Sequence, residues 1–317
     1  MITSRFFQRA LMVTGLLLAS ASANAVQSVD LPAWVCTHPD AIFVGGFESG
    51  EMSIAHNPSS GNGGSYPGNV TRNVHVAGLG SGTQSYYLYI PNHYSANRSW
   101  PVLLALDGVA PYATAGTYAQ AVINTWAPIA DAAGFIVAAP VGNAVFNDNN
   151  NQPYAISWLV PPSSGANDYD MFASIRSDIQ GAYNIDRNRI YGWGFSAGGH
   201  VMHDLGINQY SAAFNASTMA AYAVVGGDLA GLACQGLSDS QCNLALTSLS
   251  RKIPVDIHIG NSDPNYSYAA SDATRFKNEG WIDGQTLFFT AFVGGHTYTS
   301  TGMQQAWDHL CPNAIIP

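Results

Sequence analysis

Short apolar runs alternate with amphipathic segments along most of this chain, and each kind of segment predicts one kind of secondary structure. Apolar runs of strand length, several of them continuous, predict strands at Asn73–Val76, Tyr86–Ile90, Pro101–Leu106, Phe135–Ala139, Ile190–Trp193, Ala221–Val225, Val255–Ile259 and Thr286–Phe292. Helical composition or spacing predicts helices over Thr114–Ala133, Tyr169–Tyr183, Gly199–Leu205, Ala269–Asn278 and Gly302–His309. This alternation indicates the α/β class, with a mostly parallel central sheet and helices on both faces.

The N-terminus has the features of a secretory signal peptide. Arg5 and Arg9 precede an apolar core over Ala10–Ala19, and Ala23-Asn24-Ala25 fits the small-residue cleavage pattern. The apolar core is too short to predict a membrane span. We therefore expect residues 1–25 to be removed by cleavage near Ala25 and residues 26–317 to form a single domain. The expected location is secreted or periplasmic.

Composition narrows the range of partners. The 317 residues carry a formal net charge of −9, which becomes −11 once Arg5 and Arg9 are removed. Charged residues make up only 10% of the chain, so no basic patch is available to bind nucleic acid. No later apolar run is long enough to cross a bilayer, and no obligate protein partner is evident. A surface with few charged residues is common in exported proteins that act on uncharged material.

Four cysteines in an exported protein predict two disulfides. Three pairings are open, and we favour Cys234–Cys242, which closes a short loop, with Cys36–Cys311, which ties the two ends of the domain together. The cysteine spacing matches no zinc pattern, and the histidines form no ligand pair at helical spacing. We expect no metal in the chemistry and no cofactor.

The most specific local pattern is Gly194-Phe195-Ser196-Ala197-Gly198, which lies between the apolar run ending at Trp193 and the helical segment beginning at Gly199. A strand, a sharp turn with a central serine and a helix together form a nucleophile elbow. Glycines two positions before and after the serine remove the collisions that this turn would otherwise cause. The pattern predicts Ser196 as an exposed nucleophile. The alternative is a glycine-rich turn in another kind of α/β protein.

A serine hydroxyl needs a base within hydrogen-bond reach, and the base needs a carboxylate to orient it. In this arrangement the acid follows the serine along the chain and precedes the histidine. Asp263 follows the strand Val255–Ile259 and a short turn, which puts its carboxylate at the carboxyl edge of the sheet. Asp256, inside that strand, and Asp272, on the next helix, are weaker candidates. An Asx turn or helix cap beside Pro264 is the structural alternative for Asp263.

His296 is the candidate base. It follows the strand Thr286–Phe292 and a Gly-Gly turn, which lets an imidazole fold back over the sheet edge. His309 lies on the final helix, where a packed or surface role is expected. His200 and His203 follow the elbow closely enough to reach the rim of a pocket, although single helical histidines are more often packing or surface groups.

The negative oxygen of an acyl-transfer intermediate needs two hydrogen-bond donors. The N–H of Ala197, next after the nucleophile, is the first candidate. The second is the N–H of Val109, because Asp107-Gly108-Val109 follows a predicted strand and Gly108 lets the loop bend toward the site. Aromatic residues that follow strand ends or lie in loops are candidates for a substrate cleft, with plain core packing as the alternative: Tyr112, Trp126, Tyr154, Trp158 and Tyr266.

Several segments in a fixed order resemble one known group of enzymes. They are Tyr86-Tyr87-Leu88-Tyr89-Ile90-Pro91, Trp100-Pro101-Val102-Leu103-Leu104, Tyr183-Asn184-Ile185-Asp186, Arg189-Ile190-Tyr191, Asp263-Pro264 and Gly295-His296. With the elbow, they make the chain similar to the poly(3-hydroxybutyrate) depolymerase and feruloyl esterase group of α/β hydrolases over about Tyr86–Cys311. The resemblance implies an α/β-hydrolase catalytic domain with Ser196, Asp263 and His296 as its triad.

The chain departs from that group in two ways. Asp107-Gly108 stands where the group usually has His-Gly, which changes the electrostatics beside the second oxyanion donor. No separate polymer-binding domain is visible, in contrast to many secreted polyester depolymerases. Crystalline polyester is therefore a less favoured substrate than soluble or amorphous polyester, feruloylated or acetylated plant polysaccharide, or small esters.

These observations predict a secreted serine carboxylic-ester hydrolase that works through an acyl-enzyme. Its partner is an ester substrate, either polymeric or small. One alternative is a secreted peptidase or polyamide hydrolase with the same triad. Another is a non-catalytic binding protein built on the hydrolase fold, against which the complete set of serine, acid and histidine argues.

Overall fold

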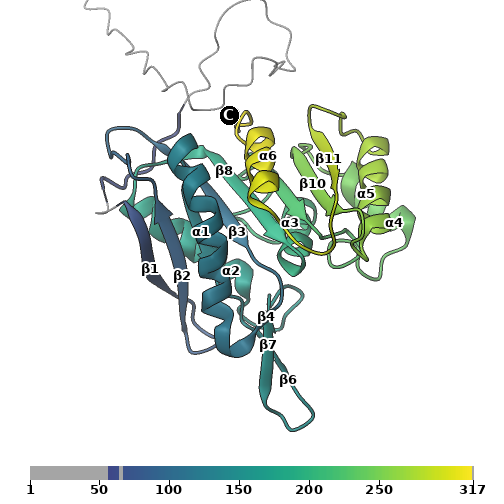
Figure 1. The fold of residues 1–317 in the computed structure, drawn as a ribbon, viewed down its shortest axis with the longest axis horizontal. Coiled ribbons are helices and arrows are strands. Elements are labelled where there is room, and N and C mark those ends of the chain that lie inside the picture. The colour runs from purple at the N-terminus through teal and green to yellow at the C-terminus, as the bar shows by residue number, and fades with distance from the viewer. Residues whose placement is uncertain (1–55, 64–66, 316–317) are drawn as a thin grey trace, which may run out of the picture. The chain divides into compact units, whose positions relative to one another are not determined.

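The computed structural model describes residues 56–63 and 67–315 (Figure 1). Within that part of the chain, a sheet of eight strands has the order β1-β2-β5-β3-β8-β9-β10-β11. The strands are β1 (Gly68–His75), β2 (Thr83–Ile90), β3 (Trp100–Leu106), β5 (Ile136–Pro140), β8 (Ile185–Phe195), β9 (Ala221–Val225), β10 (Val255–Gly260) and β11 (Leu287–Phe292). β2 pairs antiparallel with β1 and β5, and all neighbours from β5 to β11 are parallel. The predicted α/β class and mostly parallel sheet are confirmed.

Helices cover both faces of this sheet, because the central strands are apolar on both sides (Figure 1). The helices are α1 (Ala115–Ala133), α2 (Asp168–Ala182), α3 (Ala197–Asn208), α4 (Asp239–Thr247), α5 (Tyr266–Asn278) and α6 (Ser300–Leu310). α1 and α6 share one apolar core that contains Trp126, Trp193 and Trp307. α2, α3, α4 and α5 contribute to a second core that contains Phe172 and Phe276.

The parallel strands determine where the candidate site residues lie. Asp107 follows β3, Ser196 follows β8, Asp263 follows β10 and His296 follows β11. The carboxyl ends of parallel strands open at one edge of a sheet, where ligands of open α/β sheets bind. Four residues that are far apart in the sequence are thereby brought to the same edge.

Some elements have no counterpart among the predicted ones. The strands β4 (Ala110–Pro111), β6 (Ala144–Asn147) and β7 (Pro153–Ser157) form a second sheet of order β4-β7-β6, whose β6–β7 hairpin extends away from the central sheet (Figure 1). A 3-10 turn at Tyr112–Thr114 precedes α1. These strands are short and mostly exposed, so they lack the apolar periodicity on which the prediction depended. α4 was missed because only two of its nine residues are buried.

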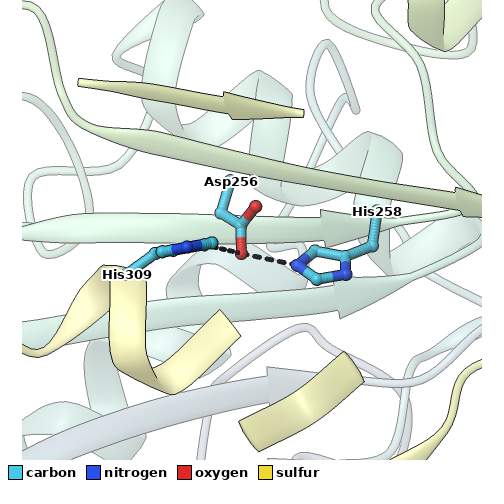
Figure 2. A group of neighbouring side chains, drawn as sticks. All are labelled: Asp256, His258 and His309. Carbon is cyan, nitrogen blue, oxygen red and sulfur yellow. Dashed lines mark hydrogen bonds and ion pairs between the residues drawn. The ribbon is translucent and has the colours of Figure 1, made fainter. Parts of the chain in front are cut away.

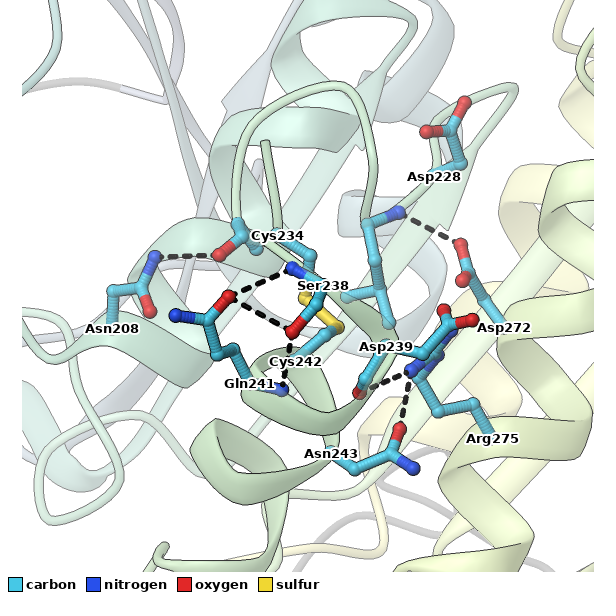
Figure 3. The surroundings of a disulfide bond; sticks show 12 residues. Asn208, Asp228, Cys234, Ser238, Asp239, Gln241, Cys242, Asn243, Asp272 and Arg275 are labelled. Carbon is cyan, nitrogen blue, oxygen red and sulfur yellow. Dashed lines mark hydrogen bonds and ion pairs between the residues drawn. A yellow bond between two sulfur atoms is a disulfide. The ribbon is translucent and has the colours of Figure 1, made fainter. Parts of the chain in front are cut away.

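The predicted Cys234–Cys242 disulfide is present, with the two Cα atoms 5.3 Å apart (Figure 3). It joins α4 to the segment before it. The N-terminus of α4 has a capping box, in which Ser238 and Gln241 accept each other's backbone N–H groups. Arg275 of α5 bonds to Asp239 and Asn243 of α4 (Figure 3), so this region is held by covalent and polar links together.

Two predictions fall outside the described residues. The signal peptide at residues 1–25 is one, and the Cys36–Cys311 pairing is the other because it requires Cys36. Across residues 56–63 and 67–315, no helix has the length and apolar character needed to span a membrane.

Candidate active site

Ser196 occupies the turn between β8 and α3. Its backbone has φ 53° and ψ −119°, and it is one of three non-glycine residues with positive φ in the described part of the chain. Such a strained conformation persists only where the surrounding structure enforces it, and strain of this kind is concentrated at functional sites. The strand, the strained serine and the helix together form the predicted elbow.

Gly194 and Gly198 allow the elbow to close. A β-carbon on Gly194 would lie 2.1 Å from the carbonyl oxygen of Gly198. A β-carbon on Gly198 would lie 2.4 Å from the carbonyl oxygen of Leu106. Neither position has room for a side chain, because backbone rather than a movable side chain fills the space. The glycine spacing in the sequence therefore has a steric cause in the structure.

Ser196, His296 and Asp263 form a continuous hydrogen-bonded chain. His296 Nε2 lies 2.7 Å from Ser196 Oγ, and His296 Nδ1 lies 2.7 Å from Asp263 Oδ2. The Asp263 side chain is 1% exposed and that of His296 is 36% exposed, so the carboxylate is buried while the imidazole reaches the surface. An imidazole that donates Nδ1–H to a carboxylate has Nε2 free to accept a hydroxyl proton.

Asp263 uses its two carboxylate oxygens differently. Oδ1 accepts the backbone N–H of Asn265 at 2.8 Å, which forms the Asx turn considered from the sequence. Oδ2 faces His296. The Asn265 side chain donates to the carbonyl oxygen of Gly226 at 3.3 Å. The Asx turn thus orients the carboxylate toward the imidazole. Asp263 forms the Asx turn and also contacts His296, so the two interpretations of Asp263 from the sequence are compatible.

Close backbone contacts hold the histidine loop against the acid turn. The N–H of Ser262 donates to the carbonyl oxygen of Gly294 at 2.8 Å. A β-carbon on Gly260 would lie 2.3 Å from the carbonyl oxygen of Gly295. Gly226, after β9, has φ 65°, and a β-carbon there would lie 3.1 Å from His296 Cε1. Sequence reasoning missed Gly226, because nothing local to residue 226 signals contact with residue 296.

Phe195 lies beside the imidazole, and Tyr298 packs against Phe195. The ring centroids of Phe195 and His296 are 5.0 Å apart, as are those of Phe195 and Tyr298. Burial, with a smaller contribution from the charge of Asp107, raises the pKa of Tyr298 to about 12. Tyr298 therefore keeps its proton at neutral pH. Its position two residues after His296 was the available sequence signal.

The loop after β3 lies directly against Ser196. A β-carbon on Gly108 would lie 2.9 Å from Ser196 Cβ, and Trp158 Nε1 donates to the carbonyl oxygen of Asp107 at 2.9 Å. Val109 follows in the same loop and is 53% exposed. Ala197 is the first residue of α3, so its N–H has no acceptor within the helix. Ala197 and Val109 remain the predicted oxyanion donors.

Asp107 stands where the resemblance leads one to expect histidine. Its carboxylate accepts the N–H of Gly108 at 2.8 Å. Burial raises the pKa of Asp107 to about 6, although the hydrogen bond from Gly108 lowers it. A titrating carboxyl therefore lies one residue from the glycine that contacts Ser196.

The weaker candidates lie elsewhere. Asp272 accepts the N–H of Leu229, and Asp256 lies between His258 and His309. His200 Nδ1 lies 2.8 Å from the carbonyl oxygen of Asp228, and His203 is fully buried against Phe276. Of these acid and base candidates, Asp263 and His296 are hydrogen-bonded to each other and, through His296, to Ser196.

The predicted substrate-binding aromatics have different surroundings. Tyr112 and Tyr154 are exposed, Tyr266 is partly buried against the core, and Trp158 retains 8% exposure while it supports the Asp107 loop. The prediction for Trp126 is wrong. Its ring is completely buried on α1, with edge contacts to Phe135 and Trp193, because that face of α1 packs on the sheet. No substrate can reach it.

No protein-family model matches the sequence, and no curated protein matches it. Solved structures do match. A ferulic acid esterase has a TM-score of 0.54 at 14% identity, covering 77% of this chain and 95% of its own. An S-formylglutathione hydrolase from Agrobacterium tumefaciens has a TM-score of 0.53 at 17% identity, covering 82% and 99%. A feruloyl esterase module from Clostridium thermocellum, complexed with sinapinate, has a TM-score of 0.52 at 14% identity, covering 82% of this chain and 95% of its own. At these identities the likeness shows the α/β-hydrolase fold.

Proposed function

We propose that this α/β-hydrolase-fold protein is an exported serine carboxylic-ester hydrolase. The observation that carries the proposal is the hydrogen-bonded chain from Asp263 through His296 to Ser196, with both hydrogen bonds at 2.7 Å. Its three members follow three different strands and meet at a strained elbow. A serine, an imidazole and a buried carboxylate in this order are what acyl transfer requires.

In the proposed reaction, Ser196 Oγ gives its proton to His296 Nε2 and attacks the ester carbonyl carbon. The N–H groups of Ala197 and Val109 donate to the resulting negative oxygen. The C–O bond to the alcohol then breaks, and the alcohol leaves with the proton from His296. Water repeats the sequence on the acyl-enzyme: His296 takes the water proton, and the acid and free Ser196 are released. Asp263 keeps the imidazole in the required tautomer throughout.

The proposed substrates are neutral esters, either a hydroxybutyrate-type polyester or feruloyl and acetyl esters of plant polysaccharide. The net charge of −9 disfavours polyanions. Exposed apolar side chains at Val109, Tyr112 and Tyr154 lie in or next to the loop after β3 and offer contact to apolar or aromatic acyl groups. Structural neighbours named as feruloyl esterases support the aromatic-acyl branch. Export is proposed from the N-terminal sequence.

The test has two stages. A fluorophosphonate probe should label the purified protein but not its Ser196→Ala variant. Amorphous polyhydroxybutyrate and feruloylated arabinoxylan are then incubated with the protein, and released acids are identified by mass spectrometry with the variant as the blank. Release of hydroxybutyrate would identify a polyester as the substrate, and release of ferulate would identify a plant-wall ester.

A matched ester and amide of the same acyl group distinguish the ester hydrolase from a peptidase or polyamide hydrolase. We expect faster cleavage of the ester by more than the intrinsic difference in reactivity. Preferential cleavage of the amide would replace the proposal with the peptidase alternative. Absence of probe labelling in folded protein would favour a non-catalytic binding protein.

A further inference from the structure

A second group of titratable side chains lies on β10 and α6, apart from Ser196, Asp263 and His296. Asp256 and His258 are two residues apart on β10, so they point to the same face of the sheet. His309 comes from the last turn of α6, which lies over that face. Figure 2 shows the Asp256 carboxylate between the two imidazoles.

The three side chains are close enough to share one ligand. Asp256 Oδ2 lies 2.7 Å from His258 Nε2 and 3.1 Å from His309 Nδ1. One candidate ligand atom from each of the three residues lies within 4.8 Å of those from the other two. Asp256 and His258 are each 1% exposed, and His309 is 26% exposed, so a buried cluster has one side open to solvent.

Hydrogen bonding within the cluster is incomplete. The contact between His258 Nε2 and Asp256 Oδ2 has hydrogen-bond geometry. Asp256 Oδ1 and His258 Nδ1 are buried atoms without a hydrogen-bond partner among the described residues, and His309 Nδ1 has the ion-pair contact to Asp256 Oδ2 at 3.1 Å. Buried polar atoms are rarely left unsatisfied. Asp256 Oδ1 has no donor, so the carboxylate has a free oxygen for a cation, and His258 would offer Nε2, the nitrogen that faces the carboxylate.

We propose that Asp256, His258 and His309 bind a divalent transition-metal ion of the Zn²⁺ class. Two imidazole nitrogens and one carboxylate oxygen are established ligands for such ions. Ligand atoms around a tetrahedral zinc lie about 3.4 Å apart, given metal–ligand distances of about 2.1 Å. The observed 2.7 Å and 3.1 Å would have to lengthen by about 0.7 Å and about 0.3 Å to reach that separation. Water would complete the coordination on the open side, at His309.

The surroundings already restrict the ligands. Phe288 of β11 stacks on the His309 ring at 3.9 Å between centroids and 7° between planes, which fixes the orientation of that imidazole. His258 and Asp256 are held in the central sheet. The ion would fasten α6 to β10, a structural role that does not depend on the proposed ester hydrolysis.

The experiment uses chelator-treated, purified protein titrated with Zn²⁺ by calorimetry and with Co²⁺ by visible absorption. We expect one equivalent to bind, a tetrahedral Co²⁺ spectrum, and a rise in Tm of about 5 °C at 100-fold excess over Kd. His309→Gln, at the exposed side, and the isosteric Asp256→Asn should each weaken binding about 100-fold or more. His75→Gln, at an exposed histidine on β1, is the matched control and should bind as the unaltered protein does.

Circular dichroism of the chelator-treated variants checks that each is folded. Absence of stoichiometric Zn²⁺ binding by the unaltered protein at 100-fold molar excess would overturn the proposal without any variant. Binding that survives unchanged in both His309→Gln and Asp256→Asn would also overturn it, because the ion would then lie elsewhere. If one variant does not fold, the other and the Co²⁺ spectrum still decide.

Discussion

Gly108 and Ser196 touch: a β-carbon on Gly108 would lie 2.9 Å from Ser196 Cβ and 3.4 Å from Ser196 Oγ. The loop after β3 and the elbow after β8 are thus packed against each other without space for one methyl group. The contact explains why residue 108 has to be glycine. It also links the position of the Val109 N–H to that of Ser196.

Gly108→Ala should therefore lower kcat/KM about 100-fold, since displacement of catalytic groups by about 1 Å has effects of that size. The measurement is hydrolysis of a p-nitrophenyl ester. Gly165→Ala is the matched control, because a β-carbon on Gly165 meets nothing within 4 Å. Equal activities of the two variants would show that the contact between Gly108 and Ser196 has no functional effect.

Ser196→Ala and Ser196→Gly should both lose activity by about 10⁴-fold or more, because each lacks the hydroxyl. Their stabilities should differ. Only glycine adopts φ 53° and ψ −119° without strain, so Ser196→Gly should unfold with a free energy about 1 kcal/mol higher than Ser196→Ala. Urea denaturation of the two variants measures this difference. A more stable alanine variant would contradict the strain at the elbow.

Asp263→Asn should reduce kcat by about 10³–10⁴-fold, because an amide no longer holds the required imidazole tautomer. Asp272→Asn is the control at another buried carboxyl, which accepts the Leu229 N–H. It should stay within about threefold of the unaltered protein. Comparable losses in both variants would argue that Asp263 acts through general stability.

Asp107 makes stability depend on pH. Its pKa of about 6 in the folded protein exceeds the ordinary value of 3.8, so between pH 4 and pH 6 the folded state binds more protons than the unfolded state. Its contribution is fully present below about pH 4 and is lost as pH rises through 6. Asp107→Asn lacks this loss and should gain about 3 kcal/mol relative to the unaltered protein between pH 4 and pH 7. Urea unfolding at pH 4, 5.5 and 7 checks the trend, and a pH-independent difference would refute it.

Trp126 and Tyr112 should respond oppositely to substitution. Trp126→Leu removes a fully buried ring and should lower the free energy of unfolding by about 3 kcal/mol with KM unchanged. Tyr112→Ala, at a 44% exposed side chain, should change stability by less than about 0.5 kcal/mol while raising KM for a bulky acyl ester. An increase in KM for the Trp126 variant would reinstate it as a substrate contact.

Local patterns in the sequence were sufficient for most of the fold. Strand β9 has the predicted bounds Ala221–Val225, because the sequence of a buried strand is a continuous apolar run. The elbow was predictable for a similar reason. Gly194 and Gly198 lie within four residues of each other, and the close backbone contacts that require glycine at both positions are mostly local. The β4-β7-β6 sheet was not predictable, since short exposed strands carry no apolar period.

The sequence by itself determined the α/β alternation, the elbow at Ser196 and the order of acid and base candidates, because each depends on neighbouring residues. Only the tertiary structure decided which carboxylate meets His296, that Trp126 is core, and that Asp256 and His258 meet His309 about 50 residues later. Those outcomes depend on which helix packs on which face and on how far each strand extends. Contacts of this kind depend on how distant segments pack together. Short-range sequence patterns contain no information about that packing.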